Sequence, residues 1–305
     1  MTTSLNQVPQ AEANLRAYAF LTTTALCWGG NAVLGRLAVG EVSPLALVAL
    51  RWLGVVLLLL VFARGPLRRD WQTLRHHLPF VFVMGALGFT SFNALFYVAA
   101  HTTTAVNIGI LQGSVPVFVL LLAFAAYRTP VRLLQATGVL TTLVGVAIVA
   151  GGGDLARLAG LAINHGDLLM VLACFLYAGY TVGLRRRPAV SALGLFTMLA
   201  LAAFAASLPL AFAEWTLGEF QWPTPKGWLF VALISLFPSF LAQICFIRGV
   251  ELIGPGRAGV FVNLVPVFAS IMAVGFLKEP FEGFHALALA LVLGGIWLSE
   301  RGKAA

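Results

Sequence analysis

The chain has 305 residues, of which 60% are hydrophobic and only 10% are charged, and its mean hydropathy is +0.94. Soluble globular domains contain roughly 45 to 50% apolar residues, so this composition excludes a soluble domain and indicates an integral membrane protein. The formal net charge of +8 does not indicate nucleic-acid binding, because the basic residues are scattered through short loops instead of clustering on one polar face.

Long apolar runs without charge fill most of the sequence. A hydrocarbon core about 30 Å thick requires roughly 20 residues of helix, whereas a membrane barrel would show alternating segments of about ten residues. The sequence therefore predicts an all-α integral membrane protein with ten transmembrane helices. The expected spans are 17–37, 43–63, 78–100, 104–127, 132–150, 166–184, 190–213, 226–249, 257–277 and 282–299.

The spans fall into two groups of five. The three glycines at 151–153 open the one sizeable connector in the middle of the chain, and we interpret it as a linker. The first apolar run is of full length and lacks a cleavage pattern, which predicts a retained helix and not a signal peptide. The expected organisation is a tail over 1–16, a five-helix repeat over 17–150, the linker 151–165, a second five-helix repeat over 166–299 and a tail over 300–305.

A four-residue motif, Val-Pro-Val-Phe, occurs at 115–118 and returns at 265–268. The same offset of 150 residues, about half of the chain, pairs Pro130 with Pro280. Because each half has an odd number of spans, the second half must enter the membrane in the opposite orientation. The sequence therefore predicts a 5+5 inverted repeat, an architecture that places transporter sites near the bilayer midplane.

Pro116 and Pro266 lie at the centres of the repeated motif. Proline lacks a backbone N–H and frees a carbonyl one turn back, so each is expected to kink its helix near mid-membrane. The kinks are candidates for gating hinges, and a packing role fits equally well.

Basic residues are divided unequally between the two sides of the membrane. Fourteen of the nineteen Lys and Arg residues fall on the side of the N-terminus, four fall on the opposite side, and Arg51 lies inside the second span. The positive-inside rule therefore predicts that both termini are cytoplasmic.

Polar residues form a stripe on the third span, where Thr90, Asn93, Tyr97 and His101 recur every three or four residues. Such spacing places them on one helical face, and because polar side chains are disfavoured against acyl chains, that face is expected to point inward. His101, near the outer mouth, is a gate candidate.

Matching the two halves extends this polar lining. Aligning the first span with the sixth pairs Trp28 with Tyr177 and Asn31 with Tyr180, close to mid-bilayer. A cavity lined by aromatic and amide side chains is expected there, although amides in membrane helices also bond neighbouring helices. The residues expected to bind substrate are Trp28, Asn31, Asn93, Tyr97, Gln112, Tyr177, Tyr180, Gln243 and Asn263.

Arg51 must face protein or water. Two roles fit it equally: an anchor for an anionic group, or a structural partner for helix carbonyls.

Several mechanisms are disfavoured by absent residues. All eleven Asp and Glu residues lie in tails, loops or at span ends, so tight proton coupling is not expected, although His101 or Glu251 at a mouth could titrate. The sequence lacks GxxxxGK[ST], HExxH and GxSxG, which excludes an ATP-driven pump and disfavours an enzyme. The three cysteines lie inside spans without metal-ligand spacing. We expect no metal and no cofactor.

Several short motifs resemble one transporter family. They are Trp28-Gly29-Gly30-Asn31, Arg51-Trp52, the mid-helix prolines and Leu277-Lys278-Glu279-Pro280. With the duplication, they resemble the ten-helix EamA-type members of the drug/metabolite transporter superfamily over nearly the whole chain. Within that family the chain is similar to a bacterial exporter of aromatic amino acids, and the resemblance implies an inner-membrane location. One departure is Thr129, at the position matching Glu279, where the family often keeps an acid.

The expected function is export of aromatic amino acids and related amphipathic metabolites by alternating access, through facilitated diffusion or exchange. The expected partners are a small-molecule substrate and the lipid bilayer, without nucleic acid. The alternatives are an exporter of other metabolites or drugs such as quaternary amines, a non-transporting membrane assembly or receptor-like protein, and an intramembrane enzyme.

Overall fold

A computed structural model describes residues 10–154 and 164–302, and every regular element within those ranges is a helix. The first half contains α1 (Gln10–Leu37), α2 (Pro44–Phe62), α3 (Arg64–Arg75), α4 (Leu78–Gly85), the π-segment Ala86–Ser91, α5 (Phe92–Ala99), α6 (Ala105–Leu111), the 3₁₀ turn Gln112–Ser114, α7 (Val115–Tyr127) and α8 (Leu133–Ala150). The second half contains α10 (His165–Gly183), the 3₁₀ turn Leu184–Arg186, α11 (Ala192–Thr216), α12 (Pro225–Ile234), the π-segment Ser235–Leu241, α13 (Ala242–Ile253), α14 (Pro255–Val262), α15 (Val265–Met272), the π-segment Ala273–Leu277 and α16 (Gly283–Arg301).

Nine helical segments of the described chain are long and apolar enough to cross a membrane, and they correspond to nine of the ten predicted spans. The exception is α1, because its middle carries three threonines, Trp28, two glycines and Asn31, which lower its hydropathy. Helix α1 begins at Gln10, so part of the expected 1–16 tail is helical. Most of the expected linker 151–165 falls outside the described residues.

The distribution of polar and apolar side chains is that of a protein surrounded by lipid. Large apolar side chains such as Leu57, Phe62 and Trp228 are exposed, whereas Thr24 and Asn93 are buried. A lipid solvent disfavours exposed polar groups, so the polar residues collect inside the helix array.

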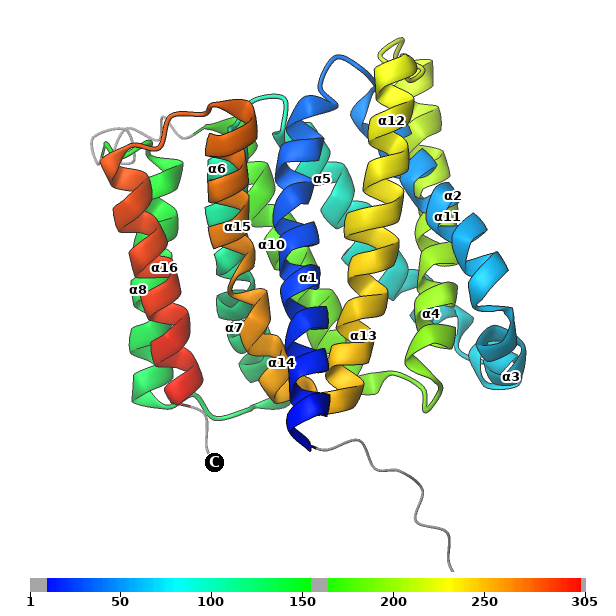
Figure 1. The fold of residues 1–305 in the computed structure, drawn as a ribbon, viewed down its shortest axis with the longest axis horizontal. Helices are drawn as coiled ribbons and strands as arrows, with labels where there is room; N and C mark the ends of the chain where they lie inside the picture. Colours follow the sequence, from blue (N-terminus) through cyan, green and yellow to red (C-terminus); the bar gives the residue numbers. More distant parts are fainter. Residues whose placement is uncertain (1–9, 155–163, 303–305) are drawn as a thin grey trace, which may run out of the picture.

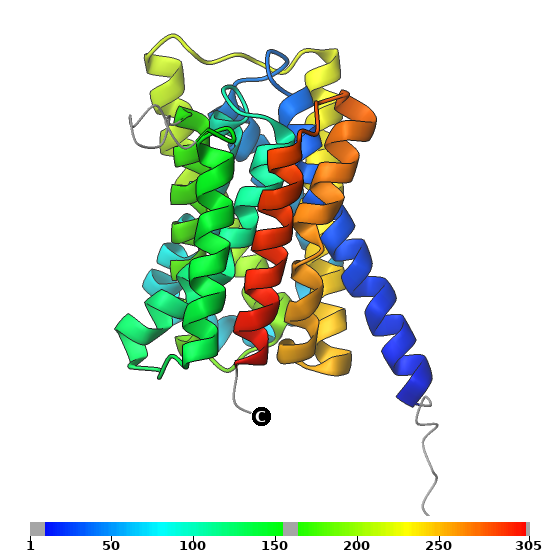
Figure 2. The same ribbon diagram turned by 90° about the vertical axis from the view of Figure 1, so that its left-hand side faces the viewer.

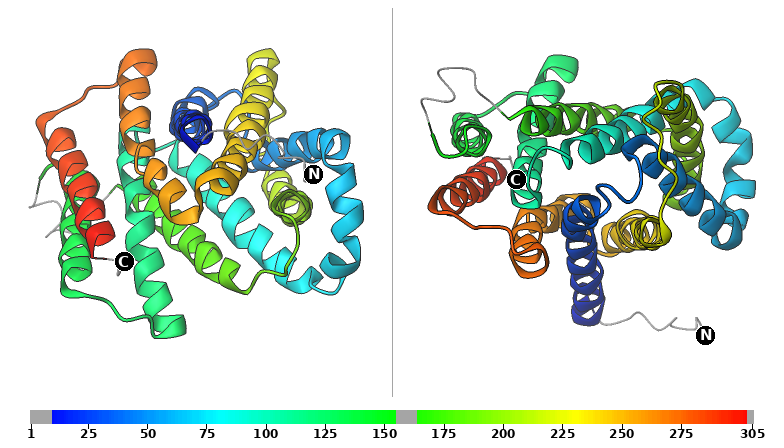
Figure 3. Two further views of the ribbon diagram at one scale, coloured as in Figure 1. Left: turned by 60° about the horizontal axis from the view of Figure 1, so that its bottom comes forward. Right: turned by 90° about the horizontal axis from the view of Figure 1, so that it is seen from above.

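The helices form an elongated array with α1 in its middle (Figure 1). Helix α1 packs against α13 and α15 of the second half. At one end α8 and α16 lie side by side (Figure 2), where Gly138 and Gly295 allow the two backbones to approach closely. The short basic helix α3 lies at the opposite end (Figure 3). The sequence prediction treated the α3 segment as a loop and missed this helix.

The two halves repeat the same irregular features 150 residues apart. The third predicted span contains a π-segment at 86–91, and the eighth predicted span contains one at 235–241. Before α8 and α16 the N-cap residue donates its backbone N–H to the side chain three residues later, from Arg132 to Gln135 Oε1 and from Glu282 to His285 Nδ1. In Figure 1 the matched segments run in opposite directions, since α4 is low and α5 high, whereas α12 is high and α13 low.

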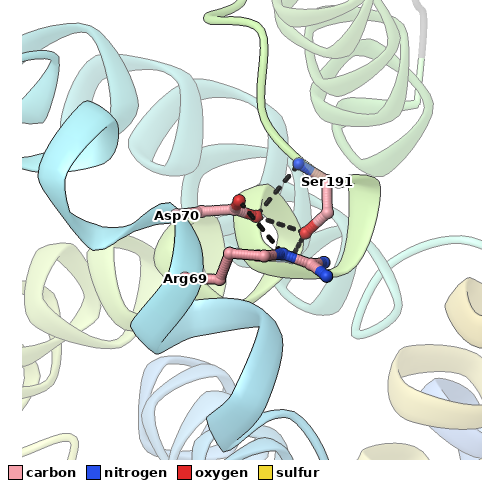
Figure 4. Close-up of polar contacts among 4 residues, drawn as sticks. Arg69, Asp70 and Ser191 are labelled. Carbon is pink, nitrogen blue, oxygen red and sulfur yellow. Dashed lines mark hydrogen bonds and ion pairs between the residues drawn. The ribbon is translucent and has the colours of Figure 1, made fainter.

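Carboxylates cap three helices that lie far from them in the sequence. Glu214 accepts hydrogen bonds from two backbone N–H groups at the start of α2, at 2.9 and 3.1 Å, and Glu279 accepts two at the start of α6, both at 3.0 Å. At the start of α11, Asp70 accepts hydrogen bonds from the N–H of Ser191 at 3.0 Å and from its hydroxyl, with Arg69 alongside (Figure 4). A negative charge at a helix N-terminus is stabilising, so these three carboxylates stabilise the N-termini of α2, α6 and α11.

Candidate functional site

Arg51, in the second span, is buried and surrounded by polar side chains from α1 and α5. Its Nη1 donates hydrogen bonds to Asn93 Oδ1 and to the Tyr97 hydroxyl oxygen, both at 2.5 Å, and to Asn31 Oδ1 at 3.5 Å. The Tyr97 hydroxyl donates to Asn31 Oδ1 at 3.0 Å. None of the four side chains is more than 5% exposed. We call these four residues the Arg51 cluster.

The Arg51 cluster brings together Asn31, Asn93 and Tyr97 from the predicted set. It contains no acid: within the described part of the chain, no Asp or Glu side chain contacts the Arg51 guanidinium. The cluster therefore holds a positive charge that is solvated only by neutral oxygen atoms.

The π-segment before α5 positions the polar face of the third span. Such segments widen a helix and are frequent at functional sites. Asn93 Nδ2 donates to Phe89 O at 2.5 Å, and the Thr90 hydroxyl donates to a backbone carbonyl of α11 at 2.8 Å. Thr90, Asn93 and Tyr97 are buried, whereas His101 follows the end of α5 and is exposed. The predicted stripe thus points inward except at its last member.

A row of aromatic rings leads away from the Arg51 cluster. Trp52, the neighbour of Arg51, stacks on Phe89 with ring centroids 4.7 Å apart and an interplanar angle of 7°. Phe89 contacts Tyr180 at 5.4 Å, Tyr180 contacts Tyr177 at 5.4 Å, and Tyr177 contacts Phe92 at 5.1 Å. Tyr180 is buried, while Tyr177 is only half-buried. The two predicted tyrosines therefore belong to one aromatic surface.

Trp28 lies apart from that row. Its Nε1 donates to Pro238 O at 3.1 Å in the π-segment of the eighth predicted span, and its ring packs on Phe246 at 5.4 Å. No ring contact joins Trp28 to Tyr177 among the described residues. The structure thus places the predicted pair on separate surfaces, with Trp28 facing the second half.

Two of the predicted amides have no hydrogen-bond partner in the described part of the chain. Gln243 on α13 and Asn263 at the break between α14 and α15 are half-buried, and neither side chain hydrogen-bonds to any described residue. Gln112 Nε2 reaches only the carbonyl of Ile108 on its own helix, at 3.4 Å. An unpaired amide in an apolar environment is unfavourable, so Gln243 and Asn263 indicate a space that water or a ligand shares.

The repeated prolines follow helix breaks and do not kink continuous helices. Pro116 is the second residue of α7, after the 3₁₀ turn that starts at Gln112, and Pro266 is the second residue of α15, after the turn at Asn263. Because proline tolerates the first turn of a helix and cannot extend a preceding one, each span is divided into two short helices. The predicted gating role stays a prediction.

The helices run between two faces of the array, and a hollow opens at each of these faces. The larger, of about 900 Å³, is lined by Arg69, Thr181, Arg185 and Pro255 among others, and Thr181 is one helical turn from Tyr177. The smaller hollow, of about 470 Å³, opens at the opposite face and is lined by His101, Glu214 and Gln221 among others. Tyr177 is thus the member of the aromatic row that lies one helical turn from a residue lining the larger hollow, on the face that carries α3.

A second polar network joins the two halves near the smaller hollow. The Asp167 carboxylate accepts hydrogen bonds from the Thr103 hydroxyl at 2.5 Å and from Asn107 Nδ2 at 3.2 and 3.3 Å. Asn107 Oδ1 lies 3.2 Å from His285 Nε2, and His285 Nδ1 accepts from Glu282 N at 2.9 Å.

Sequence reasoning did not assign a role to Asp167 or His285. The available signal was an acid placed one residue inside a predicted span, which implies a buried partner. Within the described residues, no group of three or more His, Cys, Asp or Glu side chains is arranged to hold a metal ion.

Comparisons with known proteins agree with this architecture. The model of the EamA-like transporter family matches residues 15–151 and again residues 164–301. The chain is 28% identical to the uncharacterized transporter YetK of Bacillus subtilis, with 93% of this chain and 86% of that protein covered. It is 24% identical to the uncharacterized inner membrane transporter YedA of Escherichia coli K12, with 95% and 92% covered.

One solved structure, described only as a crystal structure of a protein, is similar with a TM-score of 0.62 at 20% identity. The match covers 94% of this chain and 96% of that one. At this identity the likeness concerns the fold alone.

Proposed function

Because the chain belongs to the EamA-like transporter family, we propose that it exports aromatic amino acids and related small amphipathic metabolites across the bacterial inner membrane by alternating access. The observation that carries the proposal is a pair of half-buried amides that bond to no described residue and lie at helix interruptions, Gln243 just after the π-segment Ser235–Leu241 and Asn263 between α14 and α15. In such a site, the free amide groups form hydrogen bonds with a small polar solute and replace the water that the solute loses.

The proposed architecture is ten spans in a 5+5 inverted repeat. Helix α1 supplies the tenth span: it lies in the middle of the array and contributes Asn31 to the Arg51 cluster (Figure 1). Polar residues inside a span are tolerated where they face protein or a cavity. The matched interruptions, 150 residues apart and opposite in direction, support the inversion.

The side that carries α3 is proposed to be cytoplasmic. Helix α3, the turn after α10 and the end of α16 all bring arginines to that side, and the start of α1 and the end of α16 lie there in Figure 1. Under the positive-inside rule, both termini then face the cytoplasm. The larger hollow faces the cytoplasm in this arrangement.

The substrate path is proposed to run between the aromatic row and the unpartnered amides. Tyr177 and Trp28 supply ring surfaces, and Gln243 and Asn263 supply amides that bond to no described residue. Gln112 adds an amide whose one described bond is to the carbonyl of Ile108 on its own helix. An aromatic zwitterion matches such a lining, because stacking and hydrogen bonds replace its hydration. The rearrangement is proposed to use the helix breaks before Pro116 and Pro266.

Facilitated diffusion or exchange is the proposed mode of transport. The cap carboxylates Glu214, Glu279 and Asp70 are committed to helix N-termini, and Asp167 lies in the first turn of α10. None of these acids lies near Arg51 or the aromatic row among the described contacts, so the path offers no carboxylate to carry a coupling ion.

The direct test is transport in proteoliposomes. Vesicles containing the purified protein are loaded with a mixture of labelled amino acids, and efflux is followed against protein-free vesicles. Phenylalanine, tyrosine and tryptophan should leave faster than leucine or lysine. Equal rates in the two kinds of vesicle, for amino acids and for a mixed metabolite pool alike, contradict transport; selective movement of quaternary amines contradicts the proposed substrate class.

A pair of variants tests the path. Gln243→Leu removes an unpartnered amide and should reduce aromatic amino acid efflux about tenfold, with little change in stability because no protein hydrogen bond is lost. Trp228→Leu is the matched control, since Trp228 is half-exposed on the lipid-facing surface of α12. Unchanged efflux in a folded Gln243→Leu protein removes Gln243 from the path.

A further inference from the structure

The Arg51 cluster carries unsatisfied hydrogen-bond donors as well as an uncompensated charge. Among the buried side-chain nitrogen and oxygen atoms of the described residues, only Arg51 Nε and Trp52 Nε1 lack a hydrogen-bond partner. The hydrogen bonds from the guanidinium to described residues all come from Nη1, so Nη2, which is not fully buried, donates to none of them. A buried cation and buried donors without partners are strongly unfavourable. These groups therefore indicate a ligand that accepts hydrogen bonds and carries negative charge.

The unsatisfied donors share one environment. The guanidinium carbon of Arg51 lies 5.3 Å from the Trp52 ring centroid and 5.8 Å from that of Tyr97. The Arg51 backbone carbonyl accepts a hydrogen bond from the Ser235 hydroxyl at 3.2 Å, which ties this turn of α2 to the second half. A guanidinium with free nitrogens is suited to binding a carboxylate.

The fold does not require an arginine at this depth. Ser43 and Ser191 are the N-cap residues of α2 and α11, the second helices of the two halves. Counted from these caps, the position that matches Arg51 is Leu199, which is 3% exposed. The second half thus builds the same helix with an apolar residue in the core.

Two further members of the cluster have different surroundings at the matching positions of the second half. At the offset of 150 residues, Tyr97 matches the apolar Ile247, and Asn93 matches Gln243, whose side chain bonds to no described residue. A polar cluster present in only one of two similarly folded halves is explained better by ligand recognition than by helix packing.

We propose that Arg51 and Trp52 bind the carboxylate of the transported substrate, whose ring lies along Phe89, Tyr180 and Tyr177. This inference rests on the proposed function and extends it by naming the group that is recognised. The row of rings connects the cluster to half-buried Tyr177, one turn from the larger hollow. The substrate class is thereby narrowed to molecules that carry both an aromatic ring and an acidic group.

Binding of analogues to the unaltered protein tests the assignment without any substitution. The probes are phenylalanine, 3-phenylpropionate, phenethylamine and phenylalaninamide, measured by calorimetry in detergent and by thermal shift. The two carboxylates should bind, and the amine and the amide should bind at least about tenfold more weakly, because their replacement leaves the buried donors unpaired. Equal affinities of the acid, the amine and the amide overturn the proposal.

Variants locate the effect at Arg51. Arg51→Gln should abolish the preference for phenylalanine over phenethylamine, whereas Arg36→Gln should preserve it. Arg36 is a suitable control because it also lies within the array but donates to the Ala100 carbonyl. Persistence of the preference in a folded Arg51→Gln protein overturns the proposal. If that variant does not fold, the analogue series on the unaltered protein decides alone.

An inorganic anion offers the same chemistry as a substrate carboxylate. The analogue series is therefore repeated in chloride and in gluconate buffers. Chloride-dependent stabilisation that is lost in Arg51→Gln, without any preference for carboxylate probes, assigns the site to chloride and overturns the proposal.

Efflux measurements separate this proposal from the proposed function. If phenethylamine leaves the vesicles as fast as phenylalanine, the transport function stands and only the carboxylate site is removed. If no probe leaves the vesicles, the transport function itself is contradicted.

Discussion

Arg128 and Lys278 end α7 and the π-segment after α15 with the same left-handed backbone, at φ angles of 53° and 57°, and they lie 150 residues apart. They are the only non-glycine residues with positive φ in the described part of the chain. A conformation that L-residues rarely adopt has thus been kept at matched positions, which supports the duplication of the five-helix unit.

Glycine at either position should stabilise the protein. The left-handed conformation costs a residue with a Cβ about 1 to 2 kcal/mol, and part of that gain is offset by the greater freedom of glycine in the unfolded chain. Arg128→Gly and Lys278→Gly should each raise the free energy of unfolding by about 1 kcal/mol, measured by denaturation in detergent. Arg128→Ala is the control, because it removes the charge but keeps the strain. A gain as large in Arg128→Ala would assign the effect to charge.

Adjacent glycines on α16 provide a matched test of helix packing. A Cβ on Gly295 would lie 2.3 Å from Thr142 Oγ1 and 2.5 Å from Gly138 O, whereas a Cβ on Gly294 would meet nothing within 4 Å. Gly295→Ala should therefore lower the free energy of unfolding by about 1 to 3 kcal/mol. Gly294→Ala should be neutral or stabilising by up to about 1 kcal/mol, because alanine favours helix. Similar losses in both would show that α8 and α16 are not this closely packed in solution.

The prolines after the helix breaks should matter more for transport than for stability. Pro116→Ala and Pro266→Ala allow each span to close into a continuous helix, which removes the flexible joint that alternating access is proposed to use. Efflux should fall about tenfold, while the free energy of unfolding changes by less than about 1 kcal/mol. Pro225→Ala is the control, since Pro225 begins α12 at an ordinary helix start. A parallel loss of stability and efflux would instead favour the packing role.

His101 should make stability sensitive to acid. Partial desolvation of its ring lowers the pKa of His101 from its ordinary value of 6.5 although the residue is exposed, the charge of Arg36 lowers it further, and the charge of Glu214 opposes these effects. The unfolded chain then binds the proton more readily than the folded protein, so His101 contributes a loss of stability as the pH falls below about 6.5 and nothing above that value. When the pH is lowered from about 7.5 to about 5.5, the melting temperature of His101→Gln should therefore fall less than that of the unaltered protein.

The control for His101 is His76→Gln, because His76 is exposed at the end of α3, on the other side of the array. It controls for the loss of an imidazole side chain away from the smaller hollow. Identical pH profiles for His101→Gln and the unaltered protein would show that His101 titrates equally in the folded and unfolded states.

The sequence by itself determined the membrane class, nine of the spans and the duplicated order of motifs. These properties depend on the lengths of apolar runs and on recurring motifs such as the one around Pro116 and Pro266, which local composition reveals. The inward direction of Thr90, Asn93 and Tyr97 also followed from spacing, because a helix repeats every 3.6 residues whatever surrounds it. The hydropathy of α1 gave a weaker signal, since polar residues in its middle face other helices.

Only the tertiary structure decided which polar residues meet. Arg51 and Asn93 are 42 residues apart, and Arg51 and Ser235 are 184 apart, so no local pattern could join them. Spacing along a helix shows which face a residue occupies, but it does not show which helix packs against that face. The same limit separated Trp28 from Tyr177 and concealed the network between Asp167 and His285. It was the packing of α1, α2 and α5 that placed Asn31 and Tyr97 around a cation that no acid of the described residues contacts.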